Sequence, residues 1–329
     1  VPATFVLLWA TGFIGARCAA VLDAHGHRVV GLSRRPAPSS SSVEWVQGDL
    51  SGPADIAERL APTLADCDAV VHLVGIATEV PSQGQTFEAV HRGGTENLLR
   101  ALRLSGTEGA RFVYVSAVGA APNAPSHYAR SKAAAEAAVR DSWLSWTILR
   151  PSLVLGSGAD FLERLKGLVT RPPLSPLPLP FVPVPGDGAT RFQPVFVDDL
   201  AQCIVRALET QEAAGKTLEV GGADVVTLDE IVRAVQEALG AGHKPRWHVP
   251  RPLLFCAAAA LEALVPRPPI TADQVCVLGS DSVCDTEGMQ HILGVTPLGF
   301  GEALARSLSA ASETPAAAAA PSEAGASEV

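Results

Sequence analysis

The chain has 329 residues, of which 47% are hydrophobic and 5% aromatic, and its formal net charge is −9. This length and apolar content suffice for one large or two smaller domains with a buried core. The acidic balance argues against a nucleic-acid partner, because phosphate binding requires clustered lysine and arginine. Six cysteines are scattered without a CxxC pair, so we expect neither a disulfide framework nor a metal site.

Apolar segments alternate with helical patterns through the first 151 residues. Strands are predicted at 5–8, 28–32, 43–46, 69–73, 111–116 and 146–149, and helices at 13–25, 53–65, 84–105 and 127–141. Short, wholly apolar strands between helices are typical of a parallel sheet covered on both faces. Residues 1–151 are therefore predicted to form an α/β fold, a doubly wound parallel sheet of the Rossmann type. Its binding crevice would lie at the carboxyl edge of the strands.

The turn after the first strand has glycines at Gly12 and Gly15 but tryptophan at Trp9. Such a turn presents a helix N-terminus to a dinucleotide pyrophosphate, and the usual fingerprint has a third glycine where Trp9 stands. Three interpretations are open. The indole points outward and leaves the turn intact, or it fills the pyrophosphate slot and abolishes binding, or the sequence contains an error at this position.

The second strand is followed by Arg34 and Arg35 rather than by an acidic residue. A carboxylate there would bind the ribose 2′-hydroxyl of NAD, whereas arginine accommodates the 2′-phosphate of NADP. The sequence therefore favours NADP(H) over NAD(H). The alternative is that both arginines only solvate a loop.

The pattern changes after residue 151. The proline-rich segment 171–188 is predicted to be a loop over the crevice, and helices are predicted at 197–209 and 227–239 with a short apolar piece at 217–220 between them. Residues 152–308 are interpreted as a smaller α/β substrate-side region that completes the fold. Residues 309–329 are mostly alanine, serine, proline and glutamate, which predicts a disordered tail.

The most apolar later stretch is 252–265. It is too short for a transmembrane segment, which needs about 20 residues. A buried helix is the favoured interpretation, and a peripheral membrane contact is the alternative. Because the first strand begins almost at residue 1, no signal peptide is visible, and we expect a cytoplasmic protein that could lie peripheral to the membrane.

Tyr128 and Lys132 carry the strongest chemical signal. Residues four apart lie on one helix face, so phenol and ammonium can both point into the crevice. The ammonium is expected to lower the pKa of the phenol toward the working range of a general acid or base. Ser116 ends the preceding strand at the crevice, where its hydroxyl can hold a substrate oxygen. We predict that all three are catalytic.

Together these residues resemble the extended or atypical short-chain dehydrogenase/reductases, which include the NAD-dependent epimerase/dehydratases. Further matching segments follow in order at 70–75, 94–98, 149–152, 193–200, 272–274 and 281–283. They resemble the branch that contains the NADPH-binding accessory subunit of respiratory complex I and its bacterial relatives. The resemblance covers about residues 4–308.

The resemblance implies a path for the cofactor across the crevice. Gly12, Phe13 and Ile14 would line the pyrophosphate, and Asp49 and Leu50 would flank the adenine. Val74 and Gly75 would pass beneath the cofactor. Tyr128 and Lys132 would contact the nicotinamide ribose, and Pro151 and Ser152 would lie on the carboxamide side. Extended members often have asparagine where this chain has His91. We assign His91 no catalytic role and expect it to pack on a helix face.

Two functions follow from these residues. The first is an NADP(H)-dependent oxidoreductase that acts on a small-molecule substrate. The alternative is a non-catalytic NADPH-binding accessory or assembly protein of a quinone-linked respiratory complex. A third option is an interaction scaffold in which Trp9 has ended cofactor binding.

Overall fold

The structure is a computed structural model that describes residues 3–34, 43–52, 55–107, 109–170, 181–242, 244–265, 268 and 270–309. Its centre is a seven-stranded sheet in the order β11-β6-β5-β4-β1-β2-β3, with every neighbouring pair parallel. The strands are β1 (Thr4–Leu8), β2 (Arg28–Ser33), β3 (Glu44–Gln47), β4 (Ala69–His72), β5 (Arg111–Val115), β6 (Ser145–Pro151) and β11 (Lys216–Val220). The predicted Rossmann sheet is confirmed.

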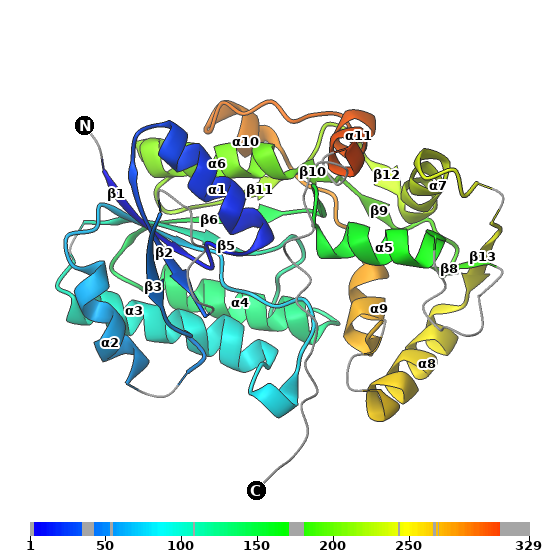
Figure 1. The fold of residues 1–329 in the computed structure, drawn as a ribbon, viewed down its shortest axis with the longest axis horizontal. Helices are drawn as coiled ribbons and strands as arrows, with labels where there is room; N and C mark the ends of the chain where they lie inside the picture. The colour runs from blue at the N-terminus through cyan, green and yellow to red at the C-terminus, as the bar shows by residue number, and fades with distance from the viewer. Residues whose placement is uncertain are drawn as a thin grey trace, which may run out of the picture.

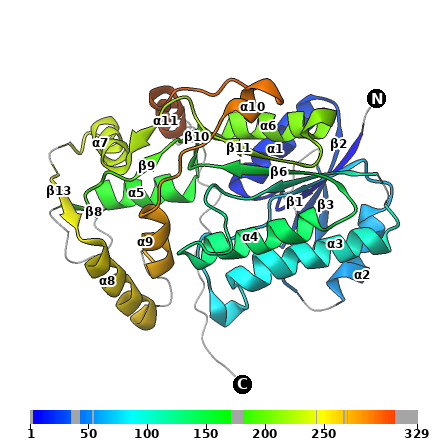
Figure 2. The same ribbon diagram turned by 180° about the vertical axis from the view of Figure 1, so that it is seen from behind.

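Helices cover both faces of this sheet (Figures 1 and 2). One face carries α1 (Phe13–Ala24) and α6 (Val197–Glu209), and the other carries α2 (Ile56–Leu64), α3 (Gly94–Leu104) and α4 (His127–Arg140). The helix predicted at 84–105 is divided: η1 (Pro81–Gln83) precedes it, and a π-helical stretch, η2 (Glu88–Gly93), leads into α3. Helix α4 begins after Ser126, whose Oγ accepts the Ala129 N–H (3.1 Å).

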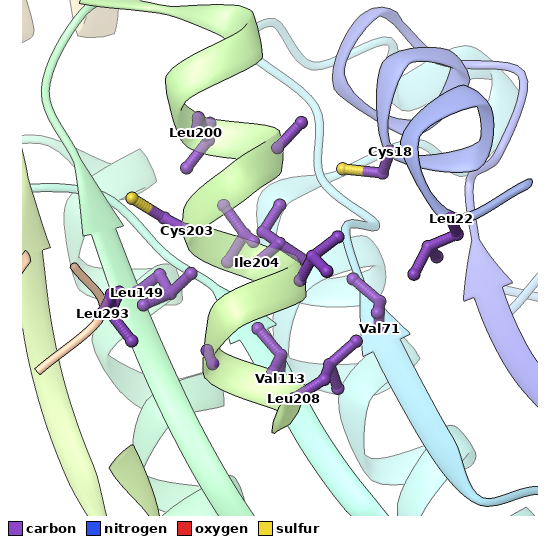
Figure 3. Packing of buried hydrophobic residues seen from close by; sticks show 14 of the residues in the cluster. Cys18, Leu22, Val71, Val113, Leu149, Leu200, Cys203, Ile204, Leu208 and Leu293 are labelled. Carbon is purple, nitrogen blue, oxygen red and sulfur yellow. The ribbon is translucent and has the colours of Figure 1, made fainter. Parts of the chain in front are cut away.

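The hydrophobic core lies between the sheet and its helices. Figure 3 shows α6 beside α1 on one face of the sheet, and Leu200, Ile204 and Leu208 of α6 belong to the buried cluster that these helices form with the strands. Cys18 of α1 and Cys203 of α6 are fully buried here, and burial raises the pKa of the Cys18 thiol to about 12. These two cysteines act as small apolar side chains, as predicted, whereas Cys256 is exposed.

Strand β11 and helix α6 come from the second half of the sequence but belong to the sheet and its cover. Strand β11 pairs along β6 from Lys216 to Val220. The short apolar piece predicted at 217–220 is thus the seventh strand. The domain boundary predicted at residue 151 therefore lies within the sheet, because the seventh strand comes after it in the sequence.

Most of the remaining elements form the outer part of the molecule, beside the carboxyl edge of the sheet (Figure 1). They are β7 (Val154–Leu155), α5 (Asp160–Thr170), β8 (Val182–Pro185), β9 (Arg191–Phe192), β10 (Val195–Phe196), β12 (Val226–Thr227), α7 (Leu228–Ala238), β13 (Arg246–Val249), α8 (Arg251–Leu264), α9 (Ala272–Leu278) and α11 (Phe300–Ser309). The two others belong to the sheet and its cover: η3 (Gln211–Ala213) contacts α6, and α10 (Glu287–His291) contacts β11. The prediction of a loop at 171–188 is wrong at β8, which pairs with β13. Residues 171–180 lie outside the described residues. Of the tail predicted at 309–329, Ser309 is the last residue of α11, and the rest lies outside the described residues.

Helix α8 contradicts its favoured interpretation as a buried helix. Of its residues, Ala258 alone is buried, while Leu253 is 62% and Leu264 is 80% exposed. The helix projects from the outer part and packs along α9 (Figure 2). In the described portion of the chain, neither α8 nor any other helix has the length and hydropathy needed to cross a bilayer.

Candidate functional site

The turn between β1 and α1 has the backbone of a glycine loop with tryptophan at its first position. Trp9 has φ +69°, a left-handed conformation that glycine adopts freely. Its N–H donates to the Leu32 carbonyl (3.1 Å), and its carbonyl accepts the Gly12 N–H (2.9 Å). A Cβ on Gly15 would lie 2.2 Å from the Trp9 carbonyl oxygen, so Gly15 is required. The tryptophan backbone is strained by about 1–2 kcal/mol.

The Trp9 indole lies against the start of α1. A Cβ on Gly12 would come within 2.3 Å of the indole Cδ1 and 2.8 Å of its Nε1. The Arg34 guanidinium carbon stands 4.5 Å from the ring centroid, on the face of the indole. The first interpretation of Trp9, an indole that points outward, is therefore wrong.

A cavity of about 210 Å³ opens beside the indole, at the carboxyl ends of β1 and β2. Its lining residues are Trp9, Thr11, Leu32, Ser33, Arg34, Gly48, Asp49, Leu50 and Val74. The structure thus brings together Arg34, Asp49, Leu50 and Val74, four of the residues predicted to bind cofactor. Sequence reasoning missed Thr11 and Ser33, whose hydroxyls are joined at 3.2 Å. Their only sequence signal is their place after β1 and at the end of β2.

A hydrogen-bonded rim joins β2 to the turn after β3. Arg34 Nη1 donates to Gln85 Oε1 (2.5 Å), and Gln85 Nε2 donates to Ser51 Oγ (3.1 Å). Ser51 in turn donates its N–H (2.9 Å) and its hydroxyl (2.7 Å) to Asp49 Oδ1. Arg34 is therefore held over the cavity by a network that reaches its opposite wall.

Helix α1 presents its N-terminus beside this cavity. Gly12 precedes the helix and no side chain caps the first turn. The N–H groups of Phe13 and Ile14 have no intrahelical acceptor, and the helix dipole favours an anion there. The side chains of Phe13 and Ile14 are partly buried and pack against the hydrophobic core, so only their backbone N–H groups face the site. The backbone therefore fits a dinucleotide pyrophosphate, although the Trp9 indole shares the space at Gly12.

Ser116 follows β5 at the carboxyl edge of the sheet. Its side chain is 4% exposed, and its Oγ makes no well-aligned hydrogen bond within the described part of the chain, although it lies close enough to the Glu136 carboxylate to help lower the pKa of that group. A buried hydroxyl at the crevice without a well-aligned partner is able to donate to a ligand atom.

Lys132 reaches the same place from α4. Its Nζ donates to the carbonyl of Val115 (3.0 Å), the residue before Ser116, and stands 5.2 Å from the centre of the Tyr114 ring. Burial lowers the pKa of Lys132 to about 8, while the negative charge of Glu136 acts in the opposite direction. The ammonium is thus charged at neutral pH and loses its proton above pH 8.

Tyr128 lies one turn earlier on α4, edge-on to Phe87 (5.8 Å) and His91 (5.4 Å). Burial, and after it the charge of Asp273, raises the pKa of Tyr128 to about 12. The predicted lowering of this pKa is therefore wrong. Both residues lie on α4 as predicted, but the loss of hydration at the phenol and the charge of Asp273 both disfavour tyrosinate.

His91 does more than pack on a helix face. Its Nε2 accepts the Ile76 N–H (3.0 Å), so Nδ1 carries the proton and donates to Ser131 Oγ (2.7 Å). Ser131 donates to the Tyr128 carbonyl (2.8 Å). His91 thus ties the segment after β4 to the turn of α4 that carries Tyr128.

Glu136 was not predicted, although it stands four residues after Lys132. It is fully buried and accepts two hydrogen bonds from Arg150 (2.8 and 2.6 Å) and one from Arg140 (2.7 Å). Burial acts to raise its pKa, but these hydrogen bonds prevail and the pKa is lowered. Glu136 is an ionised carboxylate on the same helix as Tyr128 and Lys132, and the i,i+4 spacing was its only sequence signal.

The other predicted contacts differ in how open they are. A Cβ on Gly75 would lie 3.0 Å from Lys132 Nζ and 3.3 Å from His91 Nε2, so glycine lets the chain pass closely over both side chains. Pro151 is buried in β6. The Ser152 hydroxyl donates to the Ser282 carbonyl (2.6 Å) and accepts the Gln193 N–H (3.2 Å), so it fastens the outer part to the sheet.

Helix α9 contacts the start of α4 through Asp273. The carboxylate accepts the His127 N–H (2.5 Å) and the Tyr128 N–H (3.2 Å). It thereby fixes the position of Tyr128 and contributes to its raised pKa. Gln274 beside it donates to Thr78 Oγ1 (3.0 Å), so α9 also contacts the segment after β4.

Replacing Asp273 by asparagine removes one negative charge and keeps an acceptor for the helix N-terminus. We expect the pKa of Tyr128 to fall, because a neutral neighbour no longer disfavours tyrosinate. The measurement is a pH titration of tyrosinate absorbance, in which one of the two tyrosines of the chain should ionise at lower pH while the free energy of unfolding changes little. An unchanged titration curve would contradict this role for Asp273.

A Rossmann sheet whose carboxyl edge carries a glycine turn, a nucleoside-sized cavity and a serine–tyrosine–lysine set defines a protein of the short-chain dehydrogenase/reductase type. The chain belongs to the NAD dependent epimerase/dehydratase family, whose model matches residues 7–221. It is 29% identical over 298 residues to subunit 9 of the NADH dehydrogenase [ubiquinone] 1 alpha subcomplex of Arabidopsis thaliana, covering 85% of this chain and 71% of that protein. It is 30% identical to the ceramide reductase of Caulobacter vibrioides, covering 77% and 76%.

Solved structures share the fold. MoeE5 in complex with UDP-glucose and NAD matches with a TM-score of 0.67 at 23% identity, covering 93% of this chain and 97% of the other. The UDP-N-acetylglucosamine 4-epimerase from Bacillus cereus matches with a TM-score of 0.67 at 17% identity, covering 95% and 98%. At these identities the likeness supports the architecture of the whole chain.

Proposed function

We propose that the protein is an NADP(H)-dependent oxidoreductase that reduces a carbonyl group, with Tyr128 as the proton donor. One observation carries the proposal. The hydroxyl of Ser116, the ammonium of Lys132 and the phenol of Tyr128 come from the end of β5 and from α4 to the same edge of the sheet. This edge also holds the cavity and the free helix N-terminus, which together suit a dinucleotide.

The residues divide the work of the reaction. A bound nicotinamide would supply the hydride. Ser116 Oγ donates a hydrogen bond to the substrate oxygen and orients the carbonyl. Tyr128, whose pKa of about 12 keeps it protonated at neutral pH, gives its proton to that oxygen as negative charge develops. Lys132 then stabilises the tyrosinate with its charge, which Glu136 helps it to keep.

The preference for NADP(H) rests on Arg34. Its guanidinium stands over the cavity next to Ser33, where a 2′-phosphate would find both a charge and a hydroxyl. We expect NADPH to bind more tightly than NADH. Replacing Arg34 by alanine should weaken NADPH binding about tenfold or more, since hydrogen bonds to charged groups contribute about 1.5–3 kcal/mol, and should not weaken NADH binding.

Titration of nicotinamide fluorescence checks this expectation. Arg100→Ala serves as the control, because Arg100 lies on α3 and pairs with Glu58 at the surface. Equal affinity of the natural protein for the two dinucleotides would contradict the assignment of Arg34.

The exposed helix α8 supports an apolar, lipid-like substrate class and a protein that lies on a membrane surface. Leu253, Phe255 and Leu264 are all exposed, and Trp247 precedes the helix at 58% exposure. Such a helix and tryptophan suit the interfacial region of a bilayer. One relative carries the name ceramide reductase, which fits a substrate drawn from a lipid phase.

Vesicles of phosphatidylcholine and phosphatidylglycerol test this contact. We expect the protein to sediment with them, and the double variant Leu253→Glu with Leu264→Glu to stay in the supernatant, because charges resist burial in the acyl region. Leu104→Glu is the control, since Leu104 is 53% exposed at the end of α3. Equal sedimentation of all three proteins would refute a role for α8.

The second candidate function is a non-catalytic nucleotide-binding subunit of a quinone-linked complex. The likeness to the complex I subunit and the exposed apolar surface of α8 favour it. It predicts one tightly bound NADPH per chain that no carbonyl compound oxidises, together with co-purification with a membrane complex. Oxidation of NADPH by a carbonyl compound, catalysed by the protein purified without a membrane complex, would favour the oxidoreductase over this second function.

A further inference from the structure

The contacts of Trp9 assign it a role that the glycine of the usual fingerprint cannot have. We propose that Trp9 and Arg34 form a gate over the pyrophosphate position, which the 2′-phosphate of NADP(H) opens. The gate makes Trp9 a determinant of cofactor choice, and it rests on the proposed cofactor.

The gate is closed by the indole. Its Cδ1 and Nε1 lie directly against Gly12, the residue that precedes the first free N–H groups of α1. A pyrophosphate bound to those N–H groups needs the space beside Gly12. A complete dinucleotide therefore requires the indole to turn away, whereas the cavity for the adenosine end stays open beside it.

Arg34 holds the indole in the closed position. The guanidinium covers the face of the ring at 4.5 Å and is itself fixed by its hydrogen bond to Gln85 Oε1. A cation on an aromatic face is attractive, and the planar guanidinium suits this stacking. Turning the indole therefore means giving up its contact with Arg34.

A 2′-phosphate can take Arg34 away from the indole. Both described partners of the guanidinium, the indole face and the amide oxygen of Gln85, are neutral. A phosphate forms charge-assisted, bidentate hydrogen bonds with arginine, and these are stronger than either neutral contact. The 2′-hydroxyl of NAD(H) carries no charge and cannot compete in this way. NADP(H) thus opens the gate with one of its own groups, and NAD(H) must open it against Arg34.

Two substitutions separate the indole from the backbone of the turn. Trp9→Gly removes the indole and restores the residue that adopts φ +69° freely, whereas Trp9→Ala removes the indole and keeps the strained backbone. We expect both variants to bind NADH about tenfold more tightly than the natural protein and to bind NADPH only about twofold more tightly. The dissociation constant for NADH divided by that for NADPH, measured by isothermal titration calorimetry, should fall about fivefold.

Fragment binding tests the coupling without turnover. Adenosine 2′,5′-bisphosphate should change the tryptophan fluorescence of the natural protein, and adenosine 5′-monophosphate should not. The change should vanish in Trp9→Phe, which leaves the other four tryptophans in place. Arg34→Lys keeps the charge but loses the planar stack, and it should bind NADH more tightly than the natural protein.

The outcomes distinguish the gate from the cofactor assignment. If the natural protein and Trp9→Gly bind both dinucleotides with the same ratio, the gate is wrong and the cofactor site stands. If neither binds any dinucleotide, the proposed function fails and the gate falls with it. A fluorescence change of equal size with both adenosine phosphates would also overturn the gate.

Discussion

Replacing Tyr128 by phenylalanine is expected to lower carbonyl reduction by about 10²–10⁴-fold, the usual contribution of a positioned general acid. The phenol at this position is protonated at neutral pH, and the variant has no proton to give to the substrate oxygen. The phenyl ring keeps its edge-on contacts with Phe87 and His91, so folding and NADPH affinity should be preserved. Steady-state oxidation of NADPH, followed beside a binding titration, measures both effects.

The other tyrosine of the chain, Tyr114, supplies the matched control. Tyr114 is fully buried in β5, and its hydroxyl has no partner in the described portion of the chain. Tyr114→Phe keeps the ring beside Lys132 and removes an unpaired buried hydroxyl. It should retain turnover and gain about 1 kcal/mol of unfolding free energy. Unchanged turnover in Tyr128→Phe would remove the tyrosine from the mechanism and favour the non-catalytic function.

Replacing Glu136 by alanine is expected to reduce the free energy of unfolding by about 3 kcal/mol, because it leaves two arginines without their buried partner. Arg150 is the more buried of the two, with 22% of its side chain exposed. The carboxylate also acts to raise the pKa of Lys132, so its loss should make the alkaline limb of activity begin below pH 8. Urea denaturation and a pH profile of kcat measure these two effects.

Arg140→Ala is the control for Glu136. Its side chain is 38% exposed, and without it Glu136 keeps its pair with Arg150, so the loss of unfolding free energy should be about 1 kcal/mol or less. Glu136→Gln keeps the side-chain volume and one hydrogen-bond acceptor. Its free energy of unfolding should fall by an amount between those of Glu136→Ala and Arg140→Ala. If Glu136→Ala were as mild as Arg140→Ala, the buried pair with Arg150 would not stabilise α4.

The sheet could be predicted from sequence because its strands are short, wholly apolar and separated by helices. The start of α4 at His127 follows directly from the cap at Ser126. The outer part was harder, since its strands have two to four residues and pair with partners distant in sequence. The exposure of α8 could not be read from its apolar residues, because burial depends on which elements pack around it.

The site was predictable in position more than in chemistry. Ser116, Tyr128 and Lys132 follow from their places after β5 and on α4. The direction of the pKa of Tyr128 depends instead on the water excluded around it and on Asp273, 145 residues further along the chain. The hydrogen bonds of His91 likewise join residues far apart in sequence. Such contacts have no periodic signal, so they became visible only in the folded chain.

Strand β11 has a consequence for biosynthesis. On the ribosome, residues 1–151 emerge long before Lys216, so β6 remains an open edge for the time needed to add some 65 residues, the difference between positions 216 and 151. An unpaired edge of a parallel sheet can pair with another chain. A fragment that ends at residue 151 should therefore aggregate, and extension through Val220 should suffice to close the edge.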